Sequence, residues 1–357
     1  MSLCELGLRI LVFNPNYSYI RTPGWSMNVK QNDQVPPVSI DHTVTINKYG
    51  YRGAPPIKSA APLIILSGGS TTESWIIPDR FTWAEQLETK LKQCKPNVEV
   101  ANLGKSGSNA RHNLLQLEAL SEYMPTGDIY VVLMGLNDFL FDLSIHHSFE
   151  VEESWWNRQA FMTISGDEGA FALVALVKRL YRRYTDDEIK PQAVSNFGIY
   201  LKSLREAYRN VAPNQWIDKL PDLSSHLETY KSTILKLKLF ADTHGGEIIF
   251  LTQPFVWSEK MSQETKDQLY AGFIGPNMLD PNTRWYTTKV LEEGLMSYNN
   301  TLREMCDLYG LNCIDLAKKI PREAQYFYDD FHFSIFGSQT VAEIVVDDMI
   351  NKLGFCN

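Results

Sequence analysis

A short stretch at residues 63–72, Leu-Ile-Ile-Leu-Ser-Gly-Gly-Ser-Thr-Thr, constrains the fold of this chain more than any other. It begins with four consecutive large apolar residues, a pattern typical of a strand that is buried on both faces of a sheet. Two glycines follow, and because glycine tolerates backbone angles that other residues resist, we expect a sharp turn there. Ser70 is thereby predicted at the carboxyl end of a core strand, just before a helix start. Open α/β sheets bind ligands at that edge, so Ser70 is a candidate nucleophile, although Ser-Thr-Thr is also typical of a helix cap.

From residue 62 onward, apolar runs alternate with helical periodicities. Strands are expected at residues 63–67, 98–103, 129–134, 247–251 and 312–316. Helices are expected at residues 82–93, 109–123, 223–244, 286–309 and 334–353. Strands that alternate with helices predict an α/β fold in which a parallel sheet is built with right-handed crossovers.

Two segments interrupt this alternation, at about 139–220 and 253–285. The first is rich in aromatic residues and mostly helical in period, so it is predicted as an insertion over one end of the sheet. Residues 1–60 are expected to form an N-terminal extension, with a strand at 42–47 followed by a turn. The main domain is therefore predicted to span residues 61–357.

Composition and charge exclude several classes of partner. The net charge is −8 and basic residues do not cluster, which argues against a nucleic acid. No apolar run reaches the ~18 residues that a membrane-spanning helix needs. The five cysteines lack the paired spacing of a zinc site. Cys306 and Cys313 could form a disulfide or remain two buried thiols.

Two further patterns suggest a ligand, and both are rejected. His146-His147 has no third metal ligand at a useful spacing. Gly104-Lys105-Ser106 resembles the end of a phosphate-binding loop, but Glu99 stands where that loop requires glycine. Trp155-Trp156 and Trp257 could line a substrate cleft, although such aromatic residues more often pack beneath an insertion. No metal and no cofactor are therefore predicted.

Four polar blocks fall directly after expected strands or at the start of the last helix. They are Gly68-Gly69-Ser70, Asn102-Leu103-Gly104-Lys105-Ser106-Gly107, Gly135-Leu136-Asn137-Asp138 and Asp329-Asp330-Phe331-His332. Because parallel strands deliver their carboxyl ends to one edge of the sheet, we expect these blocks to converge in space.

The blocks contain the side chains that acyl transfer needs. Ser70 would attack a carbonyl carbon, and His332 would accept the serine proton and later return it to the leaving group. Asp329 would accept from the other imidazole nitrogen and so fix the tautomer. Asp330 is the alternative partner of His332.

A developing oxyanion needs N–H donors at the same place. The candidates are the backbone amide of Ser70, the side-chain amide of Asn137 and the backbone amide of a glycine in the second block. Both Gly104 and Gly107 qualify by position.

The order of these four blocks resembles that of the SGNH hydrolases, also called GDSL-like lipases and esterases. The resemblance covers about residues 62–353, with the inserted segments outside it. It implies a three-layer α/β/α flavodoxin-like fold with a central five-stranded parallel sheet. It also implies ester hydrolysis that uses Ser70, Gly107, Asn137, Asp329 and His332.

Two details of the resemblance concern glycines. This chain has Gly69 where the motif that names the family has aspartate, but Gly-Gly-Ser-Thr-Thr resembles a known variant of that block. The spacing in the sequence between Asn102 and Gly107 resembles the Asn-x-x-x-x-Gly pattern of the family, which favours Gly107 over Gly104.

The function predicted from the sequence is that of a serine esterase acting on a small-molecule or saccharide ester. An O-acyltransferase or deacetylase acting on a saccharide is one alternative, and a non-enzymatic surface binding protein on the same scaffold is another. Residues 47–53 look like a segment of membrane-anchored members of the family. An extracytoplasmic location, or anchoring through a segment that precedes Met1, is therefore expected.

Overall fold

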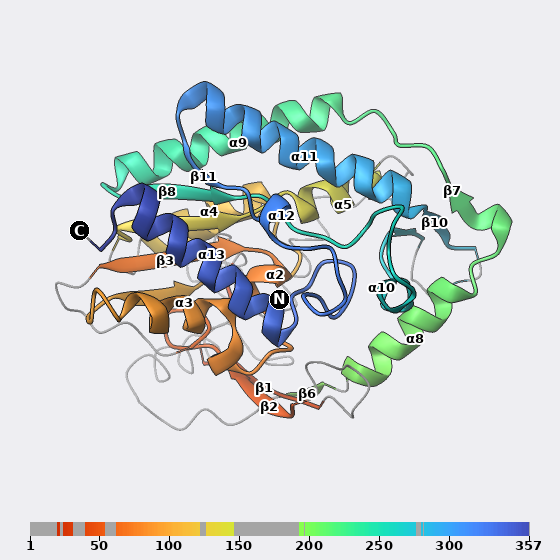
Figure 1. Ribbon diagram of the computed structural model, residues 1–357, viewed down its shortest axis with the longest axis horizontal. Helices are drawn as coiled ribbons and strands as arrows, with labels where there is room; N and C mark the ends of the chain where they lie inside the picture. The colour runs from red at the N-terminus through yellow and green to blue at the C-terminus, as the bar shows by residue number, and fades with distance from the viewer. Residues whose placement is uncertain are drawn as a thin grey trace, which may run out of the picture.

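The computed structural model describes residues 20–21, 24–30, 40–53, 62–121, 126–145, 193–195, 197–275, 280 and 282–356. Its centre is a parallel sheet of five strands (Figure 1). These strands are β3 (Leu63–Gly68), β4 (Glu99–Asn102), β5 (Ile129–Leu133), β8 (Glu247–Leu251) and β11 (Asn312–Ile314). The five strands expected from the sequence are confirmed, with differences of one or two residues at several ends.

The strand order across the sheet is β11-β8-β5-β3-β4, and every neighbouring pair is parallel. Numbered by position along the chain, this order reads 2-1-3-4-5, which is that of the flavodoxin-like doubly wound fold. The direction of winding reverses after β4, so the first and last helices lie on one face and the middle helices on the other. The predicted α/β fold class is thereby confirmed.

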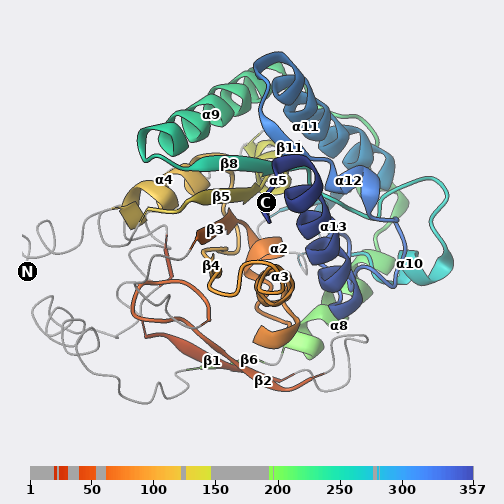
Figure 2. The same cartoon turned by 60° about the vertical axis from the view of Figure 1, so that its left-hand side comes forward.

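Among the described residues, five helices cover the sheet. They are α3 (Trp83–Leu91), α4 (Ala110–Ser121), α9 (Ser224–Thr243), α11 (Thr288–Tyr309) and α13 (Ile335–Leu353). Helix α13 packs on α3, whereas α9 packs on both α4 and α11. Figure 2 shows α3 and α13 on the opposite side of the sheet from α4 and α9. Together with the sheet they make the three layers that were expected.

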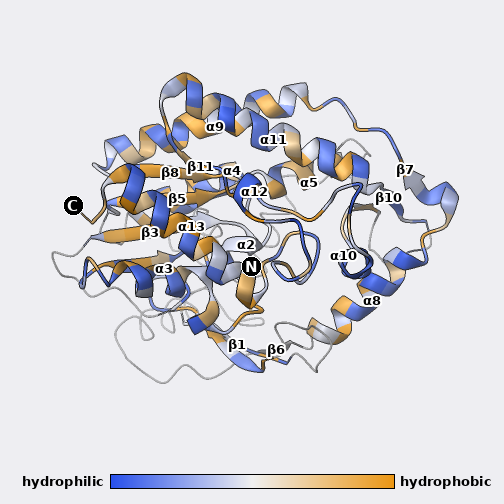
Figure 3. Ribbon diagram, in the orientation of Figure 1, coloured by the Kyte–Doolittle hydropathy of each residue, from blue (hydrophilic) through white to orange (hydrophobic). Residues whose placement is uncertain are grey.

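The central strands are buried because both of their faces are covered. All six residues of β3 and all five of β5 are buried. Figure 3 shows these strands as mainly hydrophobic, whereas α9 and α11 alternate between hydrophobic and hydrophilic residues. The helices therefore turn apolar stripes toward the sheet and polar stripes toward solvent.

Shorter elements surround this domain. The sequence did not predict two helices at the bounds that they have, α5 (Leu136–Ile145) and α8 (Phe197–Arg209). Three further helices are short: α2 (Ser70–Glu73), α10 (Gln263–Asp267) and α12 (Leu316–Lys319). One small sheet has the order β2-β1-β6, from β1 (Ser26–Val29), β2 (His42–Thr45) and β6 (Ala193–Ser195). Another has the order β7-β10-β9, from β7 (Trp216–Ile217), β9 (Phe273–Ile274) and β10 (Arg284–Tyr286). Short 3₁₀ turns occur at Asp79–Phe81 and Pro213–Gln215.

The expected N-terminal extension shares the main core where it is described. Ile20 and Tyr51 belong to the same apolar cluster as the central strands. The strand expected at 42–47 is present as β2, and the chain then turns back so that Ile46 bridges Arg52. The domain boundary near residue 60 stays a prediction, but contacts cross it.

In the part of the chain that the structure describes, two disulfides join elements of the fold. Cys306 and Cys313 join the end of α11 to β11, which decides between the two possibilities that the sequence left open. Cys94, just after α3, is bonded to Cys356 near the C-terminus. Cys4 lies outside the described residues.

Candidate active site

Ser70 lies where the central strand β3 ends. It is the first residue of the one-turn helix α2, and Gly69 forms the N-cap with an ordinary φ of −84°. Both glycines are required by space rather than by unusual backbone angles. A Cβ on Gly68 would lie 2.2 Å from Thr72 Oγ1, and one on Gly69 would lie 2.2 Å from Asn137 Nδ2. The expected turn is present, but its cause is close packing around the serine.

Three polar side chains from the two ends of the domain meet in one hydrogen-bonded row. Ser70 Oγ lies 2.7 Å from His332 Nε2. On the other side of the ring, His332 Nδ1 lies 2.7 Å from Asp329 Oδ2. With the ring proton on Nδ1, the histidine donates to the carboxylate, and its free Nε2 accepts from the serine hydroxyl.

The carboxylate of Asp329 is held from several directions. It is completely buried, and its Oδ1 accepts from the amides of Phe331 and His332 at 3.0 and 2.8 Å. Its Oδ2 also accepts from the hydroxyl of Tyr270 at 3.3 Å. The imidazole itself is stacked against Tyr328, with ring centroids 5.4 Å apart. These contacts fix both the acceptor and the ring that it orients.

Asp330, the alternative partner of His332, points elsewhere. Its carboxylate accepts from Trp257 Nε1 at 2.7 Å and from the amides of Tyr270 and Ala271 at 2.8 and 3.1 Å. The alternative pairing is therefore wrong. Asp330 instead ties the segment after β8 to the loop that carries His332. Trp257 is fully buried, so it packs beneath this segment and does not line a cleft.

Burial, together with the neighbouring charge of Asp329, raises the pKa of Asp330 to about 7. An aspartate in the unfolded chain has a pKa of about 4, so between about pH 4 and pH 7 the folded protein binds the additional proton. The contribution of Asp330 to the free energy of unfolding should therefore fall as the pH rises through this window, by ~2–4 kcal/mol.

We expect Asp330→Asn to remove this pH dependence. Urea unfolding at pH 4.5 and 7.5 measures the change in the free energy of unfolding between the two pH values. The loss of an acceptor for Trp257 affects the variant equally at both pH values, so it cancels in this difference. Wild type should lose more stability between the two pH values than the variant does. Equal changes in the two proteins would contradict the raised pKa.

The side-chain amide of Asn137 lies against Gly69, the residue before Ser70. Asn137, in the first turn of α5, donates through Nδ2 to the carbonyl of Ser108 at 2.8 Å. The same nitrogen occupies the space that a Cβ on Gly69 would need. It therefore lies between the residue before Ser70 and the residue after Gly107, and Ser108 is the one acceptor that its NH₂ group has among the described residues.

The two candidate glycines of the second block differ in what their amides do. The amide of Gly104 donates to Asn102 Oδ1 at 2.9 Å. Gly107 has φ of +81°, which favours glycine, and its amide has no acceptor within the described ranges. Gly104 has a packing reason instead, since a Cβ there would lie 2.2 Å from the amide nitrogen of Glu73. Of the two amides, that of Gly107 is the one left for a ligand.

Asp138 has a structural role that the sequence did not reveal. Its carboxylate accepts from the amide of Ala110, at 3.0 and 3.1 Å to its two oxygens, and from the amide of Gly135 at 3.2 Å. An acceptor at the first residue of α4 satisfies a helix N–H that has no partner in the helix. The acidic residue after Asn137 therefore ties the loop of the third block to the end of the second.

A second apolar cluster borders the row of polar residues. Its buried members are Ile76, Ile77, Leu201, Leu204, Tyr270 and Tyr328. Helix α8 contributes Arg205, which donates to the carbonyls of Tyr328 and Gln268. The part of the first insertion that is described thus packs against the loop of His332. His146, His147, Trp155 and Trp156 lie outside the described residues.

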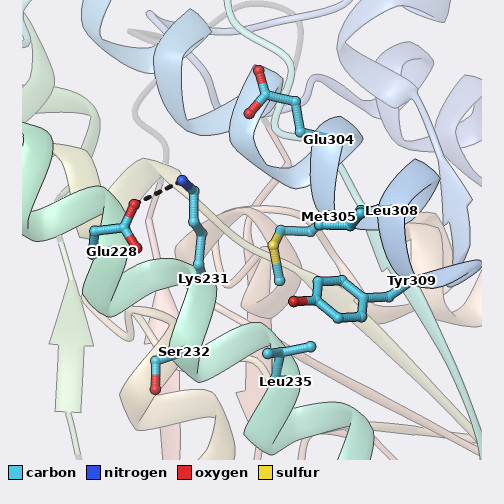
Figure 4. A pocket seen from close by; sticks show the side chains of 8 residues that line it. All are labelled: Glu228, Lys231, Ser232, Leu235, Glu304, Met305, Leu308 and Tyr309. Atoms are coloured by element: carbon cyan, nitrogen blue, oxygen red, sulfur yellow. Dashed lines mark hydrogen bonds and ion pairs between the residues drawn. The ribbon is translucent and has the colours of Figure 1, made fainter.

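Other features of the described residues lie apart from this row. A pocket of about 370 Å³ opens between α9 and α11, where Figure 4 shows Lys231 paired with Glu228 among apolar neighbours. Among the ranges that the structure covers, no three histidine, cysteine or acidic residues are grouped to hold a metal ion. Within the same ranges, no helix combines the length and the apolar character needed to cross a membrane.

Comparisons with known proteins give similar solved structures only. No family model matches the chain, and no curated protein matches it. A lipolytic protein of the G-D-S-L family from Veillonella parvula DSM 2008 is 12% identical with a TM-score of 0.41, covering 82% of this chain and 100% of that one. A lipase/acylhydrolase from Enterococcus faecalis is 14% identical with a TM-score of 0.40, covering 81% and 95%. A catalytic mutant of an acetylxylan esterase from Geobacillus stearothermophilus is 12% identical with a TM-score of 0.40, covering 83% and 96%. Identities and TM-scores of this size support no transfer of activity to this chain.

Proposed function

We propose that this protein is a serine hydrolase that cleaves a carboxylic ester through an acyl-enzyme on Ser70. The observation that carries the proposal is the unbroken row from Ser70 Oγ through the imidazole of His332 to Asp329, with both contacts at 2.7 Å. Ser70 would be the nucleophile, His332 the general base, and Asp329 the acceptor that orients the base.

In the first half of the reaction, Ser70 Oγ forms a bond to the carbonyl carbon of the ester while its proton moves to His332 Nε2. The imidazolium that results is stabilised by the buried carboxylate of Asp329. The tetrahedral intermediate then expels the alcohol, which takes the proton from Nε2, and the acyl group remains on Ser70 as an ester.

In the second half, a water molecule gives its proton to His332 Nε2 and its oxygen attacks the acyl carbon. Collapse of the second tetrahedral intermediate breaks the bond to Ser70 Oγ, and the proton on Nε2 returns to the serine. The acid is released and the enzyme is regenerated. In both intermediates the oxyanion would be bound by the amides of Ser70 and Gly107 and by the side chain of Asn137.

Labelling with a fluorophosphonate tests the proposal, since this probe reacts with an activated serine. Intact-mass spectrometry should show one adduct per chain, and peptide mapping should find it on Ser70. Absence of labelling, together with absence of hydrolysis of short p-nitrophenyl esters, would overturn the proposal in favour of a binding protein. Transfer of the acyl group to an added saccharide, instead of release of the free acid, would identify an acyltransferase.

Replacing Asn137 by alanine should lower kcat by about 10²–10³-fold with little change in KM, because the donor acts mainly on the charge that develops in the transition state. Steady-state hydrolysis of p-nitrophenyl acetate measures both constants. Asn210→Ala is a matched control, since Asn210 is exposed just after α8 and its side chain donates to the carbonyl of Glu206. An unchanged kcat in the Asn137 variant would remove this side chain from the oxyanion site.

A further inference from the structure

The helix that carries Ser70 is too short to hold itself in place. Helix α2 has four residues, and the chain leaves it through Ser74, which has a left-handed φ of 51°. The last carbonyls of a helix have no partners within it, and here almost every carbonyl of α2 is in that position. Within this turn, the carbonyl of Ser70 is paired with the amide of Ser74 at 2.8 Å, and that of Thr71 with the hydroxyl of Ser74 at 3.1 Å.

Donors from distant parts of the chain also bind the carbonyls of this turn. The carbonyl of Thr71 accepts from Trp83 Nε1 at 3.1 Å, and that of Thr72 accepts from Asn102 Nδ2 at 2.9 Å. Both donors belong to elements of the main domain. The next two carbonyls, those of Glu73 and Ser74, accept from the N-terminal segment, and that of Ser74 also accepts from the amide of Ile77 at 2.9 Å.

That donor is the side chain of Arg52. One guanidinium nitrogen, Nη1, lies 2.7 Å from the carbonyl oxygen of Glu73 and 2.6 Å from that of Ser74. Nη2 donates to the carbonyl of Ile77, and Nε donates to the carboxylate of Asp79 at 2.7 Å. Arg52 is only 5% exposed, so its charge is buried among these acceptors.

The backbone of Arg52 is fixed as firmly as its side chain. Its amide donates to the carbonyl of Asn102 at 2.9 Å, so the turn after β2 pairs with the end of β4. Gly50 allows that turn, with φ of +91°. Arg52 therefore reaches α2 from a rigid support.

A second arginine of the N-terminal segment holds the side chain of the last helical residue. Glu73 is buried, and its Oε1 lies 2.6 Å from Arg21 Nε. Its Oε2 accepts from the amide and the hydroxyl of Ser106, at 2.7 and 2.5 Å. Burial favours the neutral acid, but Arg21 and Ser106 outweigh it and lower the pKa of Glu73. Ser106 precedes Gly107, so this carboxylate also links α2 to the second block.

We propose that Arg52 is a positioning residue for the reaction, which clamps the end of α2 so that Ser70 Oγ stays in line with His332. This inference rests on the proposed function. The guanidinium makes contacts at residues 73, 74, 77 and 79, and the other end of the same helix carries the hydroxyl. Without the clamp, the carbonyl of Glu73 loses its donor, that of Ser74 keeps only the amide of Ile77, and the single turn is free to shift. A displacement of about 1 Å at the nucleophile is enough to cost about 10²-fold in rate.

The test compares Arg52→Ala and Arg52→Lys with wild type. We expect Arg52→Ala to lower kcat for p-nitrophenyl acetate by about 10²-fold with KM within about threefold. Arg52→Lys should be intermediate, because an ammonium retains the charge but lacks the planar set of five donors. Millimolar guanidinium chloride should restore part of the activity of Arg52→Ala by filling the vacated space.

Arg303→Ala is the matched control. Arg303 is a partly buried arginine whose guanidinium pairs with Asp315 at 2.8 Å, between α11 and the end of β11. It should keep the wild-type kcat and show no gain with guanidinium.

Fluorophosphonate labelling separates positioning from a loss of folded protein. The final amount of adduct counts the folded sites, and the labelling rate constant reports the reactivity of each site. Positioning by Arg52 predicts a full amount of adduct and a rate constant lowered by about 10²-fold. A normal rate constant with less adduct in Arg52→Lys, or an unchanged kcat in Arg52→Ala, would overturn the inference. If Ser70 were not the nucleophile, wild type itself would fail to label, so the two failures are distinguishable.

Discussion

Replacing Ser70 by alanine should abolish hydrolysis of short p-nitrophenyl esters, with kcat/KM lower by about 10⁴-fold or more. The hydroxyl is the only group removed, and its oxygen, Oγ, is the atom that would bond to the acyl carbon. Any residual rate would come from the N–H donors that remain around the oxyanion position. Because Ser70 Oγ has its hydrogen bond with His332 and with no other side chain of the described residues, the fold should be kept.

Steady-state kinetics with p-nitrophenyl acetate measure this loss, and circular dichroism with thermal unfolding measures the fold. Ser297→Ala is a suitable control, since Ser297 is a partly exposed residue of α11 whose hydroxyl donates to the carbonyl of Glu293. The Ser70 variant should also take up no fluorophosphonate. A variant that hydrolyses the ester at the wild-type rate would remove Ser70 from the mechanism.

Replacing Asp329 by asparagine should lower kcat by about 10⁴-fold, although the two side chains have nearly the same shape. The amides of Phe331 and His332 both donate to Oδ1, so the asparagine must keep its oxygen at that position. Its NH₂ group then faces His332 Nδ1 and donates to it. The ring proton moves to Nε2, where it faces Ser70 Oγ, and the base can no longer accept the serine proton.

The same assay measures this effect, and Asp267→Asn is the control because Asp267 is exposed in α10. The fluorophosphonate labelling rate should fall in parallel with kcat, while thermal unfolding should change little. An Asp329→Asn variant that retained more than about a tenth of wild-type kcat would show that the carboxylate does not fix the tautomer.

The main elements could be predicted from the sequence because their signals are local. Buried strands such as Ile129–Leu133 are continuous apolar runs, and helices such as Thr288–Tyr309 repeat apolar residues on one face. Periodicity is set by neighbours a few residues apart, so it survives without knowledge of the rest of the fold. No single element indicates the flavodoxin-like strand order. That order was expected only because the four polar blocks resemble those of the SGNH hydrolases.

Other features could not be predicted because they depend on space between distant segments. Adjacent aspartates 329 and 330 look alike in sequence, but one faces His332 and the other faces Trp257. Gly104 and Gly107 likewise both qualify in the sequence, but the amide of Gly104 donates to Asn102, whereas that of Gly107 has no acceptor within the described ranges. Gly69 appeared to serve a backbone angle, whereas it makes room for Asn137.

By itself, the sequence determined the alternation of strands and helices and the placement of polar blocks at strand ends, because short-range periodicity and the geometry of parallel sheets require both. Only the tertiary structure decided which side chains meet there. It brought residue 332 to residue 70, and it brought Arg52 of the N-terminal segment to the end of the same one-turn helix. Such contacts follow from the packing of whole layers, in which a donor across the fold satisfies a carbonyl that no local residue can reach.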